Sequence, residues 1–363
     1  MSWLYKAAFG SAEPSFEPQT VTFGRKSIQT TALLAEGGYS FVYTGVDPAG
    51  GRKYALKKVL AQDAETAAIA EIEIELLEQL RGPGIVECVG TLRKRVSTTT
   101  TEYWMLLELC EGSLVDLLYL KRGDEYEKRP ALAEARVLEI FEGVAEAVAR
   151  LHALLPPVTH RDLKLENVLL APSGEYVLCD FGSATRDVLP AQRSRKQALE
   201  EEERIAKYST AMYRAPEMVD LYRKHEVGPM ADCWALGCIL YALCFRAHPF
   251  AADSPLQILN GAYTIPPDSP YSERVHALVR SLLAADPTER PTAAEAAAAA
   301  RACGRDPPPP QISAAPAPAP PLALPPLDAG FDAAKWTRAA IALEDEAARL
   351  RSRDARLFAR PRT

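Results

Sequence analysis

Hydrophobic and polar positions alternate along the first third of the chain in the manner of β-strands. The alternation runs over about residues 28–60 and returns over residues 85–92 and 103–109. A period of two predicts strands with one face buried. Between these runs, over residues 63–80, apolar residues recur at helical spacing with acidic residues on the opposite face. This part of the chain is therefore expected to contain strands, one helix and further strands.

The remainder of the sequence has a mainly helical pattern. Residues 131–154 form a long amphipathic stretch, and shorter ones cover residues 278–283 and 293–302. Residues 233–245 are strongly apolar but too few to span a bilayer, so they predict a buried helix. A strand-rich part with one main helix, followed by a helical part, predicts an α+β fold with two lobes.

Changes in composition divide the chain into four segments. These are an N-terminal arm (1–25), a folded domain (26–305) with a small lobe at about 26–110 and a large lobe at about 111–305, a linker (306–330) and a tail (331–363). Proline and alanine dominate the linker, which favours an extended chain over a packed fold. The tail predicts one polar helix, which is either marginal in isolation or a docking element.

Charge and cysteine content narrow the class of protein. The net charge of −6 in 363 residues leaves no basic excess for binding nucleic acid. The seven cysteines are dispersed and never spaced as C-x-x-C, which is typical of reduced thiols in the cytosol. No apolar run is long enough for a transmembrane helix. We therefore expect a cytoplasmic protein without a transmembrane segment.

Residues 160–167 carry the most specific motif. They read H-R-D-L-K-L-E-N and match the H-R-D-L-x-x-x-N catalytic loop of phosphoryl transfer at every specified position. In such a loop Asp162 accepts the proton of the substrate hydroxyl, and Asn167 holds a magnesium ion. Lys164 would stabilise the γ-phosphate during transfer. A lysine at this position is the serine/threonine-kinase form of the loop.

A lysine at the end of a predicted strand is a candidate for binding the phosphates of ATP. Lys57 ends the run Y-A-L-K at residues 54–57, and a carboxylate from the next helix must hold its ammonium group in place. Glu71, Glu73 and Glu75 all compete for this role on different helical faces. Glu73, which lies between two isoleucines, is the preferred partner.

A second magnesium ligand follows the catalytic loop. Residues 179–182 read C-D-F-G, and their aspartate, Asp180, lies thirteen positions after Asn167. Asp180 is expected to chelate the ion that bridges the β- and γ-phosphates.

Four further residues are expected to support this site. Residues 215–217 read A-P-E, and Glu217 is expected to pair with Arg290. Thr210 is expected to bond Asp162 and Lys164, and Asp232 to fix the backbone of the catalytic loop.

With these motifs in place, residues 20–305 resemble the eukaryotic protein kinases. Within them the chain resembles the Numb-associated kinase family, which includes the adaptor-associated and cyclin-G-associated kinases. This closer resemblance rests on residues 34–43, 178–185 and 213–222, and within the family the insert at residues 191–203 resembles the cyclin-G-associated kinase. It implies a monomeric kinase domain that uses ATP and Mg²⁺ on serine and threonine residues of proteins. Clathrin-adaptor subunits are the implied substrates, and clathrin-coated vesicles the implied place of peripheral association.

The resemblance also implies an ATP pocket. Leu107 would be the gatekeeper, and Glu108 and Cys110 would belong to the hinge that bonds adenine. Cys179 would line the back of the pocket, or serve only as a small buried strand residue. The remaining expected contacts are Ala35, Gly37, Gly38, Val42, Ala55 and Leu169.

The nucleotide loop departs from the family pattern. Laid on G-x-G-x-x-G-x-V, it reads Ala35, Gly37, Ser40 and Val42, so one of three glycines is present. Side chains in such a loop keep the backbone away from phosphates. The alternatives to an active protein kinase are therefore a weak or inactive scaffold that binds partners through its proline-rich tail, and a small-molecule kinase, which Thr210 disfavours.

The activation segment, which begins at Asp180 and ends at the A-P-E motif, suggests a form of regulation. Arg161, beside Asp162, needs an anionic partner from this segment. The acidic residues 200–203 lie inside it and could supply the charge without phosphorylation. The competing interpretation is a solvated acidic helix.

Overall fold

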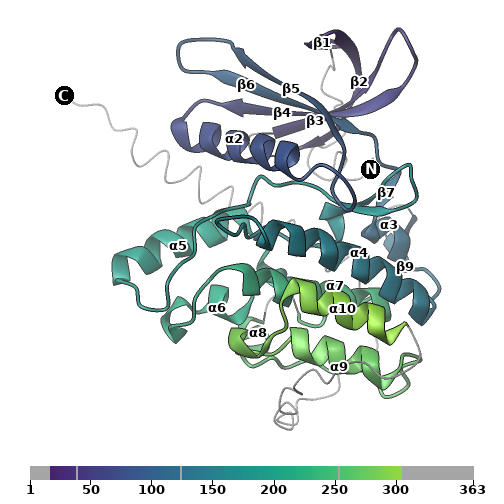
Figure 1. Cartoon of the computed structure of the whole chain (residues 1–363), viewed down its shortest axis with the longest axis vertical. Coiled ribbons are helices and arrows are strands. Elements are labelled where there is room, and N and C mark those ends of the chain that lie inside the picture. Colours follow the sequence, from purple (N-terminus) through teal and green to yellow (C-terminus); the bar gives the residue numbers. More distant parts are fainter. Residues whose placement is uncertain (1–16, 38–39, 123–124, 252–253, 305–363) are drawn as a thin grey trace. The chain divides into compact units, whose positions relative to one another are not determined.

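The computed structural model describes residues 17–37, 40–122, 125–251 and 254–304 (Figure 1). Within these residues the chain forms two compact units. The first unit contains the chain up to Leu114 together with Glu166–Ala184, and the second contains Val115–Leu165 and the chain from Thr185 onward. Gly38, most of the expected N-terminal arm, the linker (306–330) and the tail (331–363) lie outside the described residues.

One antiparallel sheet dominates the described part of the first unit. Its strands, in spatial order, are β1 (Thr20–Phe23), β2 (Lys26–Glu36), β3 (Ser40–Val46), β4 (Lys53–Ala61), β6 (Thr101–Glu108) and β5 (Cys88–Arg95). Helix α2 (Ala64–Gln79) follows β4, and the side chain of Asp63 caps it by accepting from the Thr66 amide at 2.7 Å. Strands, one helix and further strands are what the periodicity predicted.

The register of the sheet separates its two faces. Lys57 lies opposite Val42 on β3 and Met105 on β6, so these three side chains share a face. The alternate residues of β4, Tyr54 and Leu56, point to the other face, where they are almost fully buried in a hydrophobic cluster. One face is therefore core, and the other presents Lys57.

Strand β1 completes the hydrophobic cluster. It pairs with β2, and its buried residues Val21 and Phe23 pack with Ile28 and Trp104. Gly90 on β5 lies so close to Phe23 that an added Cβ would be 3.3 Å from the Cβ of Phe23. Residues 20–23, which we expected to belong to the lead-in arm (1–25), are thus part of the sheet, because their apolar side chains cover its outer face.

A small three-stranded sheet also belongs to the first unit. It joins β7 (Gly112–Ser113), β10 (Val168–Leu170) and β11 (Tyr176–Leu178). Main-chain bonds tie it to the first unit: Val86 N donates to Leu178 O at 3.0 Å, and Leu178 N to Gly84 O at 2.8 Å. The compact units therefore divide the chain differently from the expected lobe boundary at residues 110 and 111, because these bonds hold residues 166–184 to the first unit.

The described part of the second unit is mainly helical. Its helices are α3 (Leu114–Leu118), which begins on the last residue of the first unit, α4 (Glu134–His152), α5 (Arg195–Tyr208), α6 (Pro216–Val219), α7 (Pro229–Phe245), α8 (Pro255–Leu259), α9 (Glu273–Leu282) and α10 (Ala293–Cys303). Short 3₁₀ turns are η1 (Leu165–Asn167), which crosses into the first unit, η2 (Ala211–Tyr213), η3 (Leu221–Arg223) and η4 (Pro287–Glu289), and β8 (Tyr119–Arg122) pairs with β9 (Glu125–Lys128).

Helix α7 forms the centre of the second unit. Ala231 to Cys244 are all buried, as the apolar run predicted, and α7 packs against α4, α9 and α10 (Figure 1). Gly237 permits the approach to α9, since an added Cβ would lie 2.9 Å from the Cβ of Leu282. A side chain here would force the two helices apart.

Two expectations about the chain as a whole concern disulfides and membranes. All seven cysteines lie among the described residues and carry free thiols. Within the same residues, no helix has both the length and the apolar character needed to cross a bilayer.

A fully buried ion pair holds the end of the activation segment. The Nη1 and Nη2 atoms of Arg290 donate to the two carboxylate oxygens of Glu217, each at 2.7 Å, and neither side chain is exposed. Arg290 also donates to the carbonyls of Ala284 and Met230 and lies over the ring of Trp234. The pairing expected from the sequence is therefore present, with every guanidinium nitrogen hydrogen-bonded.

We predict that Arg290→Met destabilises the protein by about 3 kcal/mol or more, because Glu217 is left as a buried unpaired charge. Urea unfolding at neutral pH measures this loss. The control is Arg301→Ala, which removes a half-exposed pair with Glu142 and should change the midpoint far less. Equal midpoints for the two variants would contradict the prediction.

The burial of His248 predicts that the folded protein loses stability in acid. Burial lowers the pKa of His248 to about 4, and its Nδ1 accepts from the Phe250 amide at 3.2 Å. The folded state thus prefers neutral imidazole, whereas the unfolded chain protonates near pH 6.5. Stability contributed by this residue is complete above pH 6.5 and is lost as the pH falls towards 4.

The expected loss between pH 7 and pH 4 is on the order of 3 kcal/mol for this residue. His248→Asn keeps an acceptor for the Phe250 amide and should unfold with a shallower pH dependence than the wild type. The half-exposed His225 provides the control substitution, His225→Asn. Parallel stability curves for wild type and His248→Asn from pH 7 to pH 4.5 would contradict this assignment.

Candidate active site

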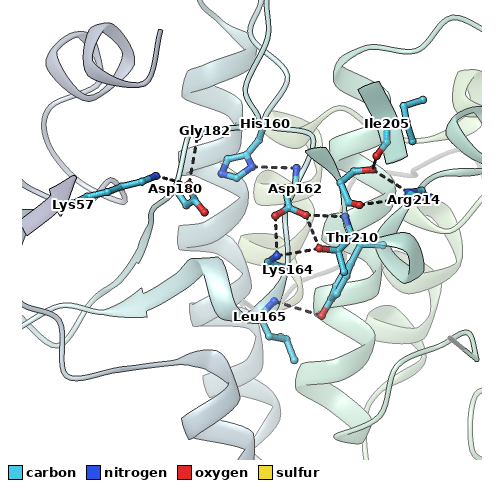
Figure 2. Close-up of polar contacts among 12 residues, drawn as sticks. Lys57, His160, Asp162, Lys164, Leu165, Asp180, Gly182, Ile205, Thr210 and Arg214 are labelled. Atoms are coloured by element: carbon cyan, nitrogen blue, oxygen red, sulfur yellow. Dashed lines mark hydrogen bonds and ion pairs between the residues drawn. The ribbon is translucent and has the colours of Figure 1, made fainter. Parts of the chain in front are cut away.

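In the first unit, Lys57 lies between two carboxylates. Its Nζ is 2.5 Å from Oε1 of Glu73 on α2 and 2.7 Å from Oδ1 of Asp180 (Figure 2 draws the Asp180 contact). Lys57 and Glu73 are buried, while the side chain of Asp180 is about half exposed. Burial opposes the charged form of Lys57, but Asp180 and Glu73 outweigh it and raise the pKa of the ammonium group. Lys57 is therefore held as a fixed positive charge.

The competing carboxylates of α2 have other partners. The Nε and Nη2 atoms of Arg93 donate to the carboxylate of Glu71. Glu75 accepts from the Gln79 side chain at 2.8 Å. Glu73 is the carboxylate against Lys57, as its position between two isoleucines suggested. The ATP-binding role of the pair stays a prediction.

The D-F-G segment is shaped by close packing around this ion pair. Asp180 has a left-handed backbone with φ of 60°, a conformation that non-glycine residues rarely adopt. The Gly182 amide approaches Oδ1 of Asp180 at 3.4 Å. An added Cβ on Gly182 would lie 3.3 Å from that oxygen and 3.8 Å from Nζ of Lys57. Phe181 is fully buried and anchors the turn.

Expected ATP contacts share the sheet face of Lys57. Ala35 lies opposite Val42, and Ala55 opposite Leu107, in the same cross-strand register that aligns Val42 with Lys57. Directly opposed residues project from the same face. The four apolar side chains are half-buried, so this face offers an apolar surface next to a fixed cation.

The expected hinge and its neighbours also belong to the first unit. The Glu108 amide donates to Glu87 O at 3.0 Å, and its carboxylate accepts from the Glu87 amide at 2.8 Å. Cys110 is buried, and Leu169 lies on β10 opposite Ser113. These bonds fix the backbone at the end of β6, where a hinge would bond adenine.

The nucleotide loop is a tight hairpin at its base. Gly37 N donates to Ser40 O at 2.7 Å, and an added Cβ on Gly37 would lie 3.0 Å from Oγ of Ser40. A side chain at the single glycine that matches the family pattern would therefore press on the Ser40 hydroxyl. Gly38 lies outside the described residues, so its role stays a prediction.

Cys179, which precedes Asp180, carries a free thiol of intermediate exposure. Burial, with the Asp180 carboxylate adding to it, raises the pKa of the Cys179 thiol well above its ordinary value. A neutral, partly buried thiol fits the interpretation of Cys179 as a small packing residue.

Asn167 and Asp180 have the chemistry expected of magnesium ligands. Both supply oxygen donors, which Mg²⁺ prefers, and both belong to the first unit. The Cys179 amide donates to the carbonyl of Asn167 at 3.0 Å, so the two segments that carry the ligands are bonded together. Asn167 is buried whereas Asp180 is half exposed. These residues would hold the ion together with nucleotide phosphates and water.

In the second unit, Asp162 is held by Thr210 and Lys164 (Figure 2). Its Oδ1 accepts from the Thr210 amide at 2.9 Å and from the Thr210 hydroxyl at 2.7 Å. Its Oδ2 lies 2.8 Å from Nζ of Lys164, which also donates to Oγ1 of Thr210 at 3.0 Å. The carboxylate is thus oriented by three donors, in the arrangement expected for Thr210.

The backbone of the catalytic loop rests on Asp232 of α7. The buried carboxylate of Asp232 accepts from the His160 amide at 2.7 Å and from the Arg161 amide at 3.0 Å. His152 at the end of α4 adds a third contact at 3.0 Å from Nε2, which the sequence did not predict. Arg161 has φ of 69°, so this left-handed turn is stabilised by a buried carboxylate.

The side chain of Arg161 pairs with Glu201 of α5. Both side chains are less than a tenth exposed. Burial, with Arg204 nearby, lowers the pKa of Arg161 to about 10, so the guanidinium remains charged at neutral pH. Among the acidic residues 200–203, Glu200 pairs with Lys196 on the surface. One member of the acidic run therefore supplies the anionic partner, and its neighbours are solvated.

Helix α5 is itself firmly anchored. Ser194 and Gln197 form a capping box at its start. Arg193, just before it, donates to the carbonyls of Leu221 at 2.8 Å and His225 at 2.9 Å. Glu201 is thus presented by a capped helix, and its charge does not depend on a modification.

Comparison with known proteins agrees with the site. Residues 28–300 match the family model described as protein kinase domain. Two proteins of Dictyostelium discoideum, each named probable serine/threonine-protein kinase, are 40% identical over 277 residues and 35% identical over 274 residues. Actin-regulating kinase 1 of Saccharomyces cerevisiae is 33% identical over 280 residues.

These alignments cover about three quarters of this chain. They cover 34% and 24% of the two Dictyostelium proteins and 43% of the yeast protein. The chain thus spans less than half the length of these relatives, and the similarity concerns the kinase domain.

The Arg161–Glu201 pair predicts activity without phosphorylation. Protein expressed in bacteria and treated with phosphatase should phosphorylate a generic protein substrate at the untreated rate. Glu201→Gln should lower kcat by roughly 10-fold, because Arg161 beside Asp162 loses its buried anionic partner. Glu202→Gln, on the exposed side of the same helix, is the matched control. A treated enzyme that is inactive and recovers on phosphorylation would refute the prediction.

Proposed function

The chain belongs to the protein kinase family, and from this premise we propose that it transfers the γ-phosphate of ATP to serine and threonine hydroxyls of proteins. The observation that carries the proposal is the Asp162 carboxylate held by Thr210 and Lys164. A threonine bonded to both residues, within a segment that ends in an anchored A-P-E motif, supports a peptide substrate. A small-molecule kinase does not need this threonine.

Asp162 would accept the proton of the substrate hydroxyl. The hydroxyl oxygen forms a bond to the γ-phosphorus, the bond from that phosphorus to the β–γ bridging oxygen breaks, and ADP leaves. Because Thr210 occupies Oδ1 with two hydrogen bonds, the carboxylate cannot rotate freely, and the hydroxyl is aligned before reaction. Lys164 would stabilise the charge on the transferred phosphoryl group.

Lys57 would bind the α- and β-phosphates of ATP. Its ammonium group is already positioned by Glu73, so binding requires little reorganisation. Asn167 and Asp180 would hold Mg²⁺, which when bound neutralises the charge of the β- and γ-phosphates. Asp180 contacts Lys57 and would also be a ligand of the metal, so one carboxylate would serve both positive charges. The proposal draws on residues of both units.

We also propose membership of the Numb-associated kinase family and clathrin-adaptor subunits as substrates. The support is the sequence resemblance over residues 34–43, 178–185 and 213–222. Helix α5 overlaps the 191–203 insert and adds a structural element to the activation segment. A cytoplasmic location with peripheral association to clathrin-coated vesicles belongs to the same proposal.

The proposal is tested with radiolabelled ATP and a panel of adaptor medium subunits beside a generic protein substrate. Asp162→Asn and Lys57→Ala should each lower kcat by roughly 100-fold or more, because they remove the proton acceptor and the phosphate ligand. Asp268→Asn, an exposed carboxylate far along the chain, serves as the control for the charge change.

The outcomes separate three functions. Labelling of an adaptor subunit well above the generic protein supports the trafficking substrate, and equal labelling rejects it. Binding of magnesium-ATP without transfer to any protein identifies a scaffold, the alternative suggested by the glycine-poor loop. Equal labelling by wild type and Asp162→Asn would refute the mechanism itself.

A further inference from the structure

Arg214 closes the peptide segment that carries Thr210. Its Nε donates to Oγ of Ser209 at 3.0 Å, and its Nη2 donates to the Ser209 carbonyl at 2.9 Å (Figure 2). One side chain therefore joins two positions that lie five apart in the sequence. Neither residue was among those predicted from the sequence motifs.

The geometry of these bonds restrains Ser209 strongly. A guanidinium group is a rigid planar fork, so two bonds from it fix both the position and the orientation of the residue that accepts them. Ser209 also caps the C-terminus of α5. Its Oγ donates to the Ile205 carbonyl at 2.6 Å, and its backbone amide donates to the same carbonyl. Ser209 is thus held from both sides, by Ile205 and by Arg214.

The restraint matters because the next residue is Thr210. A side-chain hydroxyl can rotate to recover a hydrogen bond, but a backbone amide moves only with the chain. The Thr210 amide donates to Oδ1 of Asp162 at 2.9 Å, so this bond depends directly on where Ser209 lies. Displacing Ser209 by an ångström would break it.

We propose that Arg214 is a positioning residue for Asp162, acting through Ser209 and the Thr210 amide. The inference rests on the proposed kinase function only for its effect on catalysis. Its structural part, the placement of the Thr210 amide, is independent of that function. Arg214 is mostly removed from solvent, and burial lowers its pKa while the Asp162 carboxylate acts in the opposite direction, which agrees with a guanidinium close to the site.

The first experiment reads the placement of Thr210 without any assay of activity. In protein labelled with ¹⁵N at threonine, Arg214→Leu should accelerate hydrogen exchange of the Thr210 amide by roughly 10-fold or more, because the amide loses its fixed acceptor. The Thr185 amide, which donates to Thr159 O at 2.9 Å, is the internal reference and should be unchanged. Arg195→Leu, at the exposed start of α5, is the matched control.

The second experiment is a double-mutant cycle with Asp162→Asn. Arg214→Leu should lower kcat by roughly 10-fold or more in the wild type, with the KM for ATP changed less than about twofold, and should lower it less than about twofold in Asp162→Asn. A residue that acts by positioning the carboxylate has little left to do once the carboxylate is gone. Arg214→Lys, which keeps the charge and one bond, should recover part of the rate.

The outcomes distinguish this inference from the proposed function. Unchanged exchange at Thr210 in Arg214→Leu overturns it whether or not the protein is a kinase. If the wild type is active and the effects of Arg214→Leu and Asp162→Asn on kcat multiply, the inference is overturned as well. Arg214 then has a purely structural role. An inactive wild type refutes the proposed function, and the exchange experiment then decides the inference alone. If Arg214→Leu does not fold, Arg214→Lys and Ser209→Ala carry the same comparisons.

Discussion

The chemistry of the second unit depends on one buried carboxylate, that of Asp232. It is fixed by α7, a helix buried along nearly its whole length, and it accepts the amides of His160 and Arg161. A left-handed arginine persists only where the surroundings compensate for its strain, and Asp232 provides that compensation. Asp162 follows directly, so the direction in which its carboxylate leaves the backbone is set by α7. Thr210 and Lys164 then adjust only the rotation of the side chain.

Buried charge organises both units in the same way. Lys57 with Glu73, Arg161 with Glu201 and Arg290 with Glu217 are all removed from water. Such pairs add little net stability compared with apolar packing, yet an unpaired member is costly. Their effect is therefore to exclude conformations in which the partners separate. A catalytic site gains from this exclusion, because the electrostatic groups are oriented before the substrate arrives.

Much of the fold and site could be predicted because motifs encode chemistry locally. The catalytic loop, the D-F-G turn and the strand that ends in Lys57 follow from spacing and period, and the pairing of Glu217 with Arg290 followed from the family pattern. Three other features depend on contacts between distant segments. Strand β1 belongs to the sheet through two apolar side chains, residues 166–184 join the first unit through main-chain bonds, and Arg214 matters through the position of a backbone amide. The second and third leave no periodic signal, and the alternation of polar and apolar residues in β1 covers only four residues.

A glutamate opposite Arg161 differs physically from a phosphate in two respects. It carries one negative charge where a phosphate carries nearly two, and it cannot be removed. The pair is nevertheless strong because it is buried, where a single charge interacts more strongly than in water. Any control of this contact would have to act on the position of α5 rather than on its charge. That position depends on the capping box at Ser194 and on the bonds from Arg193 to two carbonyls. Regulation through this segment would therefore require a partner that displaces the start of α5.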